Sequence, residues 1–309
     1  MPRELQLVNI EDAKPGKVYY PIQIKQVPKP TPGPNEVLVR MTAAALNHRD
    51  LFIRQHLYPN IDPAKPLLAD GCGVVVAVGS AASPSLLHQR VILTPSRGWA
   101  RDPLGPEDPS RFAGVAGPGK NVLITGVGGG VALQVLQFVV AMGSNAYVTS
   151  GDQAKIDRAV AMGAKGGVLY KEPRWGATLR KTLLPKERPW LDAVIDGAGG
   201  AVVAETAGVL RHGGVIAQYG MTVAPKMEWL MKAVLANIDL RGSTMGSRQE
   251  FRDMVAFVNK HKIKPVISQT VHGLGNLDEI NGLFDVMAAG SQFGKLVIEI
   301  DDDEENAKL

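Results

Sequence analysis

A glycine-rich loop at residues 126–130 constrains the fold of this chain more than any other feature. It stands between an apolar run, Asn121–Thr125 (NVLIT), and an apolar helical stretch, Val131–Met142. Glycine permits a tight turn and lets the backbone approach a pyrophosphate, which the N–H groups and dipole of a helix N-terminus attract. Read as G-x-x-G-x-x-A, the loop predicts a dinucleotide-binding βαβ unit rather than an ordinary glycine turn. The residues predicted to contact the cofactor here are Gly126, Gly128, Gly129, Gly130 and Val131.

The rest of residues 118–262 repeats the same alternation of a short apolar run and a helical stretch. Short apolar runs at 145–149, 167–169, 193–196 and 215–219 alternate with helical stretches that end near glycines. Apolar runs without alternation indicate strands covered on both faces, and helices between them indicate parallel strands. The fold class predicted for this region is α/β, a Rossmann-type doubly wound parallel sheet.

Composition narrows the class of protein further. Of 309 residues, 45% are hydrophobic and 21% charged, so a sizeable core can form and global disorder is excluded. The net charge of +4 is spread along the chain without a basic block, which argues against a nucleic-acid partner. A single cysteine, Cys72, excludes an internal disulfide, and no apolar run approaches the roughly 18 residues of a membrane span. We expect a soluble, cytoplasmic protein.

The end of the second Rossmann strand predicts which cofactor binds. An NAD site usually places an acid there to hold the ribose 2′-hydroxyl. Here the strand tip is Ser150, with Lys155 one helical turn on. A hydroxyl and an ammonium suit a 2′-phosphate, which favours NADP(H). Asp152 is the counter-evidence, and we interpret it as the N-cap of the following helix.

Four segments together resemble the medium-chain dehydrogenase/reductase superfamily, and within it the zinc-free quinone oxidoreductase-like and fungal zinc-binding-dehydrogenase-like proteins. They are LNHRDLFIRQHLY (46–58), ADGCGVVVAV (69–78), GKNVLITGVGGGVA (119–132) and GSQFGKLVIEI (290–300). The resemblance implies a β-rich GroES-like substrate domain in residues 1–117, completed by a return segment, 263–300. It also implies a cleft between this domain and the Rossmann domain, and a homodimer.

The resemblance implies a site without zinc. Zinc-dependent relatives use a cysteine where this chain has Asn47, and a histidine where it has Ala69. Without a metal, hydrogen-bond donors must polarise a carbonyl. Asn47 is predicted to orient the substrate or the nicotinamide. Tyr58 is predicted to donate to a developing enolate or phenolate, and an ordinary packed tyrosine is an equally open interpretation.

Further cofactor contacts follow from the resemblance and from the rule that ligands of doubly wound sheets bind at the carboxyl ends of strands. They are Tyr170 after the third strand, Gly197 after the fourth, Gly220 and Met221 after the fifth, and Phe293 and Lys295 in the closing segment.

The chain departs from the family pattern between Phe112 and Gly119. Relatives carry about 40–50 residues there, which finish the GroES-like barrel and lead into the Rossmann domain, so the β-rich domain is expected to be incomplete.

Two alternative functions are compatible with these features. The first is an NADPH-dependent reductase that transfers hydride to a quinone or an α,β-unsaturated carbonyl. The second is a non-catalytic NADPH-binding protein, crystallin-like or regulatory.

The segment 301–309 opens with five acids and is expected to be a solvated tail. It ends Ala307-Lys308-Leu309, which is similar to the S-K-L peroxisomal signal. A peroxisomal location is therefore the alternative to the cytoplasm.

Overall fold

The computed structural model describes residues 2–10, 15–16, 19–58, 61–94, 116–224 and 226–300. The chain forms two compact units, one from residues 1–95 with 267–309 and one from residues 96–266. We call them unit 1 and unit 2 and describe each by itself. The tail at 301–309 and residues 112–115 of the expected deletion point at Phe112–Gly119 lie outside the described residues. The sequence-based boundaries after residues 117 and 262 therefore stay a prediction.

Unit 2 is built on a six-stranded parallel sheet in the order β11-β10-β9-β6-β7-β8. The strands are β6 (Asn121–Ile124), β7 (Asn145–Ser150), β8 (Gly166–Leu169), β9 (Leu191–Asp196), β10 (Leu210–Gln218) and β11 (Asp239–Gly242). Consecutive strands run outward from β6 to β8, and then outward from β9 to β11 on the other side. This order is the doubly wound arrangement, so the predicted fold class is confirmed.

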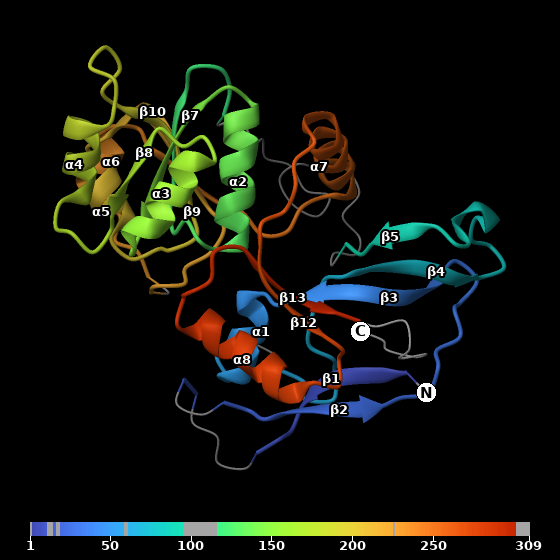
Figure 1. The fold of residues 1–309 in the computed structure, drawn as a ribbon. Helices are drawn as coiled ribbons and strands as arrows, with labels where there is room; N and C mark the ends of the chain where they lie inside the picture. Colours follow the sequence, from blue (N-terminus) through green and yellow to red (C-terminus); the bar gives the residue numbers. More distant parts are fainter. Residues whose placement is uncertain are drawn as a thin grey trace. The chain divides into compact units, whose positions relative to one another are not determined.

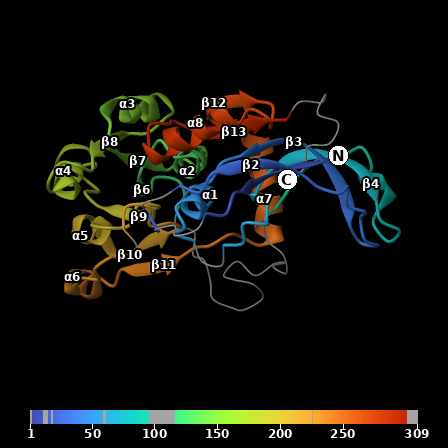
Figure 2. The same ribbon diagram turned by 90° about the horizontal axis from the view of Figure 1, so that it is seen from below.

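Helices cover both faces of this sheet. They are α2 (Gly130–Ala141), α3 (Gln153–Ala161), α4 (Trp175–Thr182), α5 (Val202–Thr206) and α6 (Met231–Leu235), whereas α7 (Arg248–His261) contacts α2 through Phe257 and Phe138. Apolar side chains of α4, α5 and α6 share one buried cluster, and Figure 2 shows these three helices on one side of the sheet. Helix α5 is shorter than the sequence predicts, because Leu210 already begins β10. No helix within the described ranges is long and apolar enough to cross a membrane.

Unit 1 joins segments from both ends of the sequence (Figure 1). Its five-stranded sheet has the order β12-β13-β3-β4-β5, and a separate antiparallel pair is formed by β1 and β2. The strands are β1 (Arg3–Leu7), β2 (Ile22–Gln26), β3 (Val37–Ala45), β4 (Cys72–Val78), β5 (Arg90–Ile92), β12 (Ile267–His272) and β13 (Lys295–Glu299). Its helices are α1 (His48–Arg54), the short 3-10 helix η1 (Pro84–Leu86) and α8 (Leu277–Ala288).

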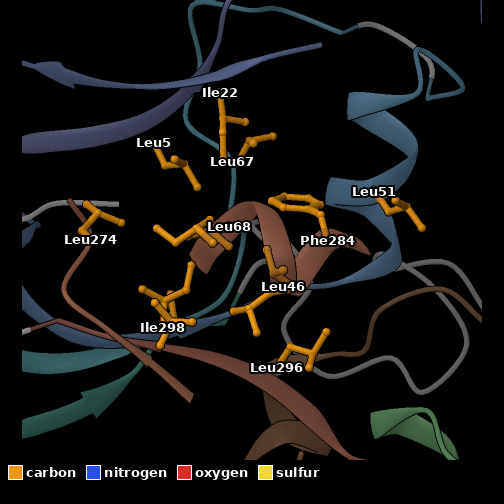
Figure 3. Close-up of a cluster of buried hydrophobic side chains, with 14 of the residues drawn as sticks. Leu5, Ile22, Leu46, Leu51, Leu67, Leu68, Leu274, Phe284, Leu296 and Ile298 are labelled. Carbon is orange, nitrogen blue, oxygen red and sulfur yellow. The ribbon is translucent and has the colours of Figure 1, made fainter. Parts of the chain in front are cut away.

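The pairing of β13 with β3 closes unit 1. It is antiparallel, with Val297 opposite Ala45 and Glu299 opposite Ala43. Helices α1 and α8 then pack beside this sheet over a core of buried aliphatic side chains grouped around Phe284 (Figure 3). The labelled members include Leu5, Leu46, Leu67, Leu296 and Ile298, each at most 2% exposed. The functional side chains of unit 1 therefore project from a rigid, long-range core.

Candidate functional site

The glycine loop of unit 2 has the geometry that a pyrophosphate needs. Gly126 and Gly128 have φ of +65° and +132°, which an L side chain rarely adopts, and a Cβ on Gly126 would meet no atom within 4 Å. Helix α2 begins at Gly130, and its N-cap, Gly129, provides no side-chain cap for the first N–H groups. The open space and the uncapped helix N-terminus fit a dinucleotide phosphate.

A buried carboxylate lies directly beneath this loop. Asp196, the last residue of β9, is fully buried and accepts a short hydrogen bond from the Thr125 hydroxyl. Its oxygens also accept the N–H groups of Ala198 and Gly199, at 3.0 Å and 2.8 Å. Thr125 Oγ1 in turn accepts the N–H of Gly197, at 3.1 Å. Asp196 therefore ties the turn after β6 to the loop after β9, a connection that the sequence analysis did not identify.

The loops after β9 and β10 lie side by side. The N–H of Thr222 donates to the Gly197 carbonyl at 3.1 Å, and a Cβ on Gly199 would lie 3.2 Å from the side chain of Met221. Tyr219, between these loops, is half-buried, and its partial burial together with the Asp196 charge raises its pKa to about 12. The structure therefore groups the predicted residues Gly197, Gly220 and Met221 at one edge of the sheet.

Three predicted residues and one further cation meet at the tip of β7. Asp152 caps α3 through the Ala154 N–H at 2.9 Å, which confirms its predicted N-cap role, and the Ser150 hydroxyl accepts the Asp152 N–H. Tyr170 donates its N–H to the Ser150 carbonyl, and its hydroxyl lies over Gly151 beside Lys171. Lys171 was missed, although its place just after β8 is the signal that could have found it.

Lys155 lies in the first turn of α3, close to this tip. Burial is the main reason that its pKa is lowered, and the nearby Arg158 charge lowers it further, while Asp152 acts in the opposite direction. A site that already holds several cations gains from binding an anion. The β7 tip is therefore electrostatically suited to a phosphate.

The second cluster of polar residues is in unit 1 and centres on Asn47, the N-cap of α1. Its Nδ2 donates to the Ala45 carbonyl at 3.2 Å and to Asp70 Oδ2 at 3.1 Å. Its Oδ1 accepts from Lys295 Nζ at 2.9 Å. Both amide hydrogens of Asn47 are thus used inside the protein, and Asn47 holds Lys295, while its predicted role toward substrate or nicotinamide stays a prediction.

Lys295, at the start of β13, has one N–H donor without a hydrogen-bond acceptor among the described residues. Its Nζ donates to Asn47 Oδ1 and to the Leu46 carbonyl at 3.0 Å. Asp70 Oδ2 lies 3.8 Å away, within ion-pair range but beyond hydrogen-bond distance. An ammonium has three N–H donors, so the third has no hydrogen-bond acceptor among the described residues. Burial lowers the pKa of Lys295, and the charges of Asp70 and Asp50 offset part of this effect.

The rest of this cluster is held by Asp50, which is fully buried. Its carboxylate accepts the N–H of Asn47 at 2.8 Å and that of Leu68 at 2.9 Å. Burial raises the pKa of Asp50 despite these bonds. The neighbouring His48 has its pKa lowered, first by burial and then by the Lys295 charge.

Tyr58, the other residue predicted to be catalytic, contacts Arg49. The Tyr58 ring is 40% exposed and lies under the Arg49 guanidinium, 5.5 Å from its carbon. It lines a hollow of about 200 Å³ with Ile53 and Lys65. Phe293 is 3% exposed, and its N–H donates to Ser268 Oγ at 3.2 Å.

The residues around Asn47 do not fit a zinc ion. A zinc site takes thiolate, imidazole or carboxylate ligands at about 2.0–2.3 Å. Asn47 and Ala69 stand where relatives supply ligands, and the Lys295 ammonium already contacts Asn47 and pairs with Asp70. Nowhere in the described part of the chain do three His, Cys, Asp or Glu side chains gather into a possible metal site.

These features define a nucleotide-binding dehydrogenase fold, and comparison with known proteins places it in a family. The family described as zinc-binding dehydrogenase matches residues 130–260, and the alcohol dehydrogenase GroES-like domain matches residues 33–139. The chain is 49% identical to the zinc-type alcohol dehydrogenase-like protein YogA of Leptosphaeria maculans, with 93% of this chain and 97% of that protein covered. The chain belongs to the medium-chain dehydrogenase/reductase family, whose members are oxidoreductases that bind a nicotinamide cofactor.

Comparisons at lower sequence identity find similar proteins. A zinc-type alcohol dehydrogenase-like protein of Schizosaccharomyces pombe is 27% identical, with 87% of this chain and 92% of that protein covered. The structure of an NAD-dependent alcohol dehydrogenase superposes with a TM-score of 0.78 at 24% identity, covering 97% of this chain and 100% of that one. A quinone oxidoreductase of Pseudomonas syringae gives 0.74 at 19% identity, with 97% and 100% covered. At these identities the two structures show the fold alone.

The alignment with the Leptosphaeria protein also bears on the expected deletion. It extends over 348 residues, whereas this chain has only 309. The alignment must therefore contain gaps in this chain. Their position is not fixed by this number, so the placement of the missing block near Phe112–Gly119 stays a prediction.

Replacing Asp196 should destabilise unit 2. In Asp196→Asn one accepting oxygen is lost, so the buried donors of Thr125, Ala198 and Gly199 compete for fewer acceptors. We expect unit 2 to lose about 2–3 kcal/mol of unfolding free energy. Urea unfolding followed by tryptophan fluorescence measures this, because all four tryptophans lie in residues 96–266. The exposed Asp157→Asn is the control, and equal stability of both variants would contradict the role of Asp196.

Proposed function

We propose that this protein is an NADPH-dependent reductase that transfers hydride to a quinone or an α,β-unsaturated carbonyl without zinc. The observation that supports this most is the third N–H donor of Lys295, which has no acceptor among the described residues. The bound cofactor supplies the hydride. Lys295 donates a hydrogen bond to the substrate oxygen, on which negative charge accumulates as the hydride adds.

The other residues of this cluster position Lys295. Asn47 and the Leu46 carbonyl fix two of its donors, so the third points in a defined direction. The Lys295 side chain therefore loses little conformational entropy when substrate binds. Asp50 holds the Asn47 backbone through the bond at 2.8 Å. The Tyr58 hydroxyl has no hydrogen-bond partner in the described part of the chain, and we assign it to the substrate side of the hollow that it lines.

Three features support NADP over NAD. The tip of β7 ends in a serine instead of an acid, the carboxylate of Asp152 is engaged as the α3 cap, and Lys155 and Lys171 lie close by. A 2′-phosphate there would gain charge-assisted hydrogen bonds, whereas a bare ribose would gain little.

The zinc-free assignment follows from the poor fit of the Asn47 cluster to that metal. We expect the purified protein to contain far less than one zinc per chain, and its activity to persist in a chelator. Elemental analysis near one zinc per chain, with activity lost to the chelator, would contradict this.

We also propose a homodimer formed through unit 2. Apolar side chains are exposed along α6 and β11, at the edge of the parallel sheet: Met231 is 69% exposed, Val234 51% and Leu240 44%. An exposed edge strand flanked by apolar groups is a natural surface for a second copy. Light scattering that gives the mass of one chain would exclude this assembly.

Cofactor preference tests the role of the β7 tip. We expect NADPH to bind about ten- to thirtyfold more tightly than NADH, which corresponds to one charge-assisted contact of about 1–2 kcal/mol. Lys155→Ala and Lys171→Ala should each reduce this ratio in calorimetry, mainly by weakening NADPH. Lys165→Ala, just before the amino end of β8, is the control. A ratio near one in the unmodified protein, or an unchanged ratio in both variants, would argue for another cofactor.

The pH dependence of kcat/KM tests Lys295. Because only the ammonium has a third N–H beyond the two bound to Asn47 and Leu46, activity should fall as pH rises through the Lys295 pKa, and burial places this basic limb below the ordinary value of 10.5. Asp70→Asn removes a charge that raises this pKa, so the limb should move to lower pH. Lys295→Met should cut kcat by about 10²–10³-fold. If Lys295→Met lowers NADPH affinity instead and leaves kcat intact, Lys295 serves the cofactor, as the sequence analysis predicts.

The non-catalytic alternative is separated by a direct assay. NADPH oxidation should be measured against a panel of quinones and enones, beside a version with about 45 residues of the Leptosphaeria relative inserted near residue 115. Turnover by the chain as it stands supports the reductase. Tight NADPH binding without turnover, together with turnover in the restored version, supports the binding-only function.

A further inference from the structure

Unit 2 contains a hollow that the proposed reaction does not use. It has a volume of about 540 Å³ and is lined in part by Trp190 and Leu210. Trp190 immediately precedes β9, and Leu210 begins β10, so the hollow lies at the amino ends of these strands. The predicted cofactor residues Gly197 and Gly220 follow the carboxyl ends of the same strands. The two sites are therefore at opposite edges of the sheet.

Three cationic side chains line this hollow. Arg180, Arg211 and Lys232 line it together with His212, and no carboxylate does. Asp192, the acid paired with Arg211 at 3.1 Å, also binds Arg188 at 2.6 Å and accepts the Asn121 N–H. Arg180 and Lys232 have no ion-pair partner among the described residues. The hollow thus carries more positive charge than the neighbouring protein neutralises.

Two of these cations converge on one point, Gly208. Arg180 Nη1 donates to the Gly208 carbonyl at 3.1 Å. A Cβ on Gly208 would collide with Lys232 Nζ, so the absence of a side chain is what admits the ammonium. Gly208 is not in the left-handed region, so its backbone conformation does not require glycine. Two like charges brought together repel each other, and an anion between them would relieve this repulsion.

The remaining lining is apolar. Trp190 is 37% exposed and Leu235 71% exposed, and both face the hollow with buried Val209. The backbone of Trp190 is fixed by the bond from Asn121 Nδ2 to its carbonyl at 2.9 Å. The volume falls within the range of about 300–1,000 Å³ that suits small organic ligands.

We propose that this hollow binds a small organic anion, whose phosphate, carboxylate or sulfonate group lies between Arg180 and Lys232 and whose apolar body lies on Trp190 and Leu235. This site is separate from the cofactor site and does not depend on the proposed reductase function. Leu235 lines this hollow and belongs to α6, which forms part of the proposed dimer surface. Dimer formation would therefore affect the binding of such a ligand.

The test uses two probes that share an aromatic body and differ in charge. These are 8-anilinonaphthalene-1-sulfonate and neutral N-phenyl-1-naphthylamine, titrated by calorimetry into the full chain with saturating NADPH and, separately, saturating NADH. We expect one saturable site for the sulfonate, with affinity at least about tenfold above that of the neutral probe, as one charge-assisted contact would give.

Three variants locate the site. Lys232→Glu should remove most of the preference for the sulfonate, and Lys181→Glu, the same charge change one residue along α4 from Arg180, should leave it intact. Gly208→Ala keeps every charge but displaces the Lys232 ammonium, so it should also weaken the sulfonate. Circular dichroism and light scattering confirm fold and assembly for each variant. Equal affinity for both probes, competition by the cofactor, or equal effects of Lys232→Glu and Lys181→Glu would each overturn the proposal.

Discussion

The antiparallel pairing of β13 with β3 is the contact on which the rest of unit 1 depends. It joins residues about 250 positions apart, with the whole of unit 2 inserted between them. The pairing brings Lys295 to Asn47, a separation of 248 residues along the chain. Such a contact costs loop-closure entropy, which grows only slowly with loop length. The buried cluster around Phe284 offsets it, because β13 contributes Leu296 and Ile298 to that cluster.

Unit 2 depends on a different constraint, the parallel arrangement of its sheet. Parallel strands bring their carboxyl ends to one edge, so the loops after β6, β7, β9 and β10 meet there without any special contact. Asp196 makes this meeting rigid by accepting donors from the turn after β6 and from the loop after β9. A buried carboxylate is tolerated at that point because three donors replace the water that it loses.

In the zinc-free reaction that we propose, the Asn47 cluster places the Lys295 ammonium as the cation of the site. A lysine ammonium contacts the residue that replaces one metal ligand, and a carboxylate next to the second replaced position pairs with it. An ammonium is a weaker electrophile than a divalent metal, but it can donate both a hydrogen bond and a proton to a developing oxyanion. This difference in chemistry supports the proposed conjugated acceptors, whose negative charge is delocalised, over simple alcohols.

Local sequence determined the elements whose physics is local. The glycine loop, the apolar strands β6, β7 and β9 and the capping role of Asp152 could all be predicted, because turn conformation, two-sided burial and helix capping depend on a few adjacent residues. The sequence pattern failed at the end of α5, where Leu210 continues an apolar run but belongs to β10, since periodicity alone does not separate a buried helix turn from a buried strand. Only the tertiary structure showed that Asn47 has no free donor while Lys295 has one, and that the Tyr58 ring lies under Arg49. It alone brought Arg180 and Lys232 to Gly208. These contacts join residues far apart in the chain, and the number of donors left free at a side chain is decided by all of its neighbours together.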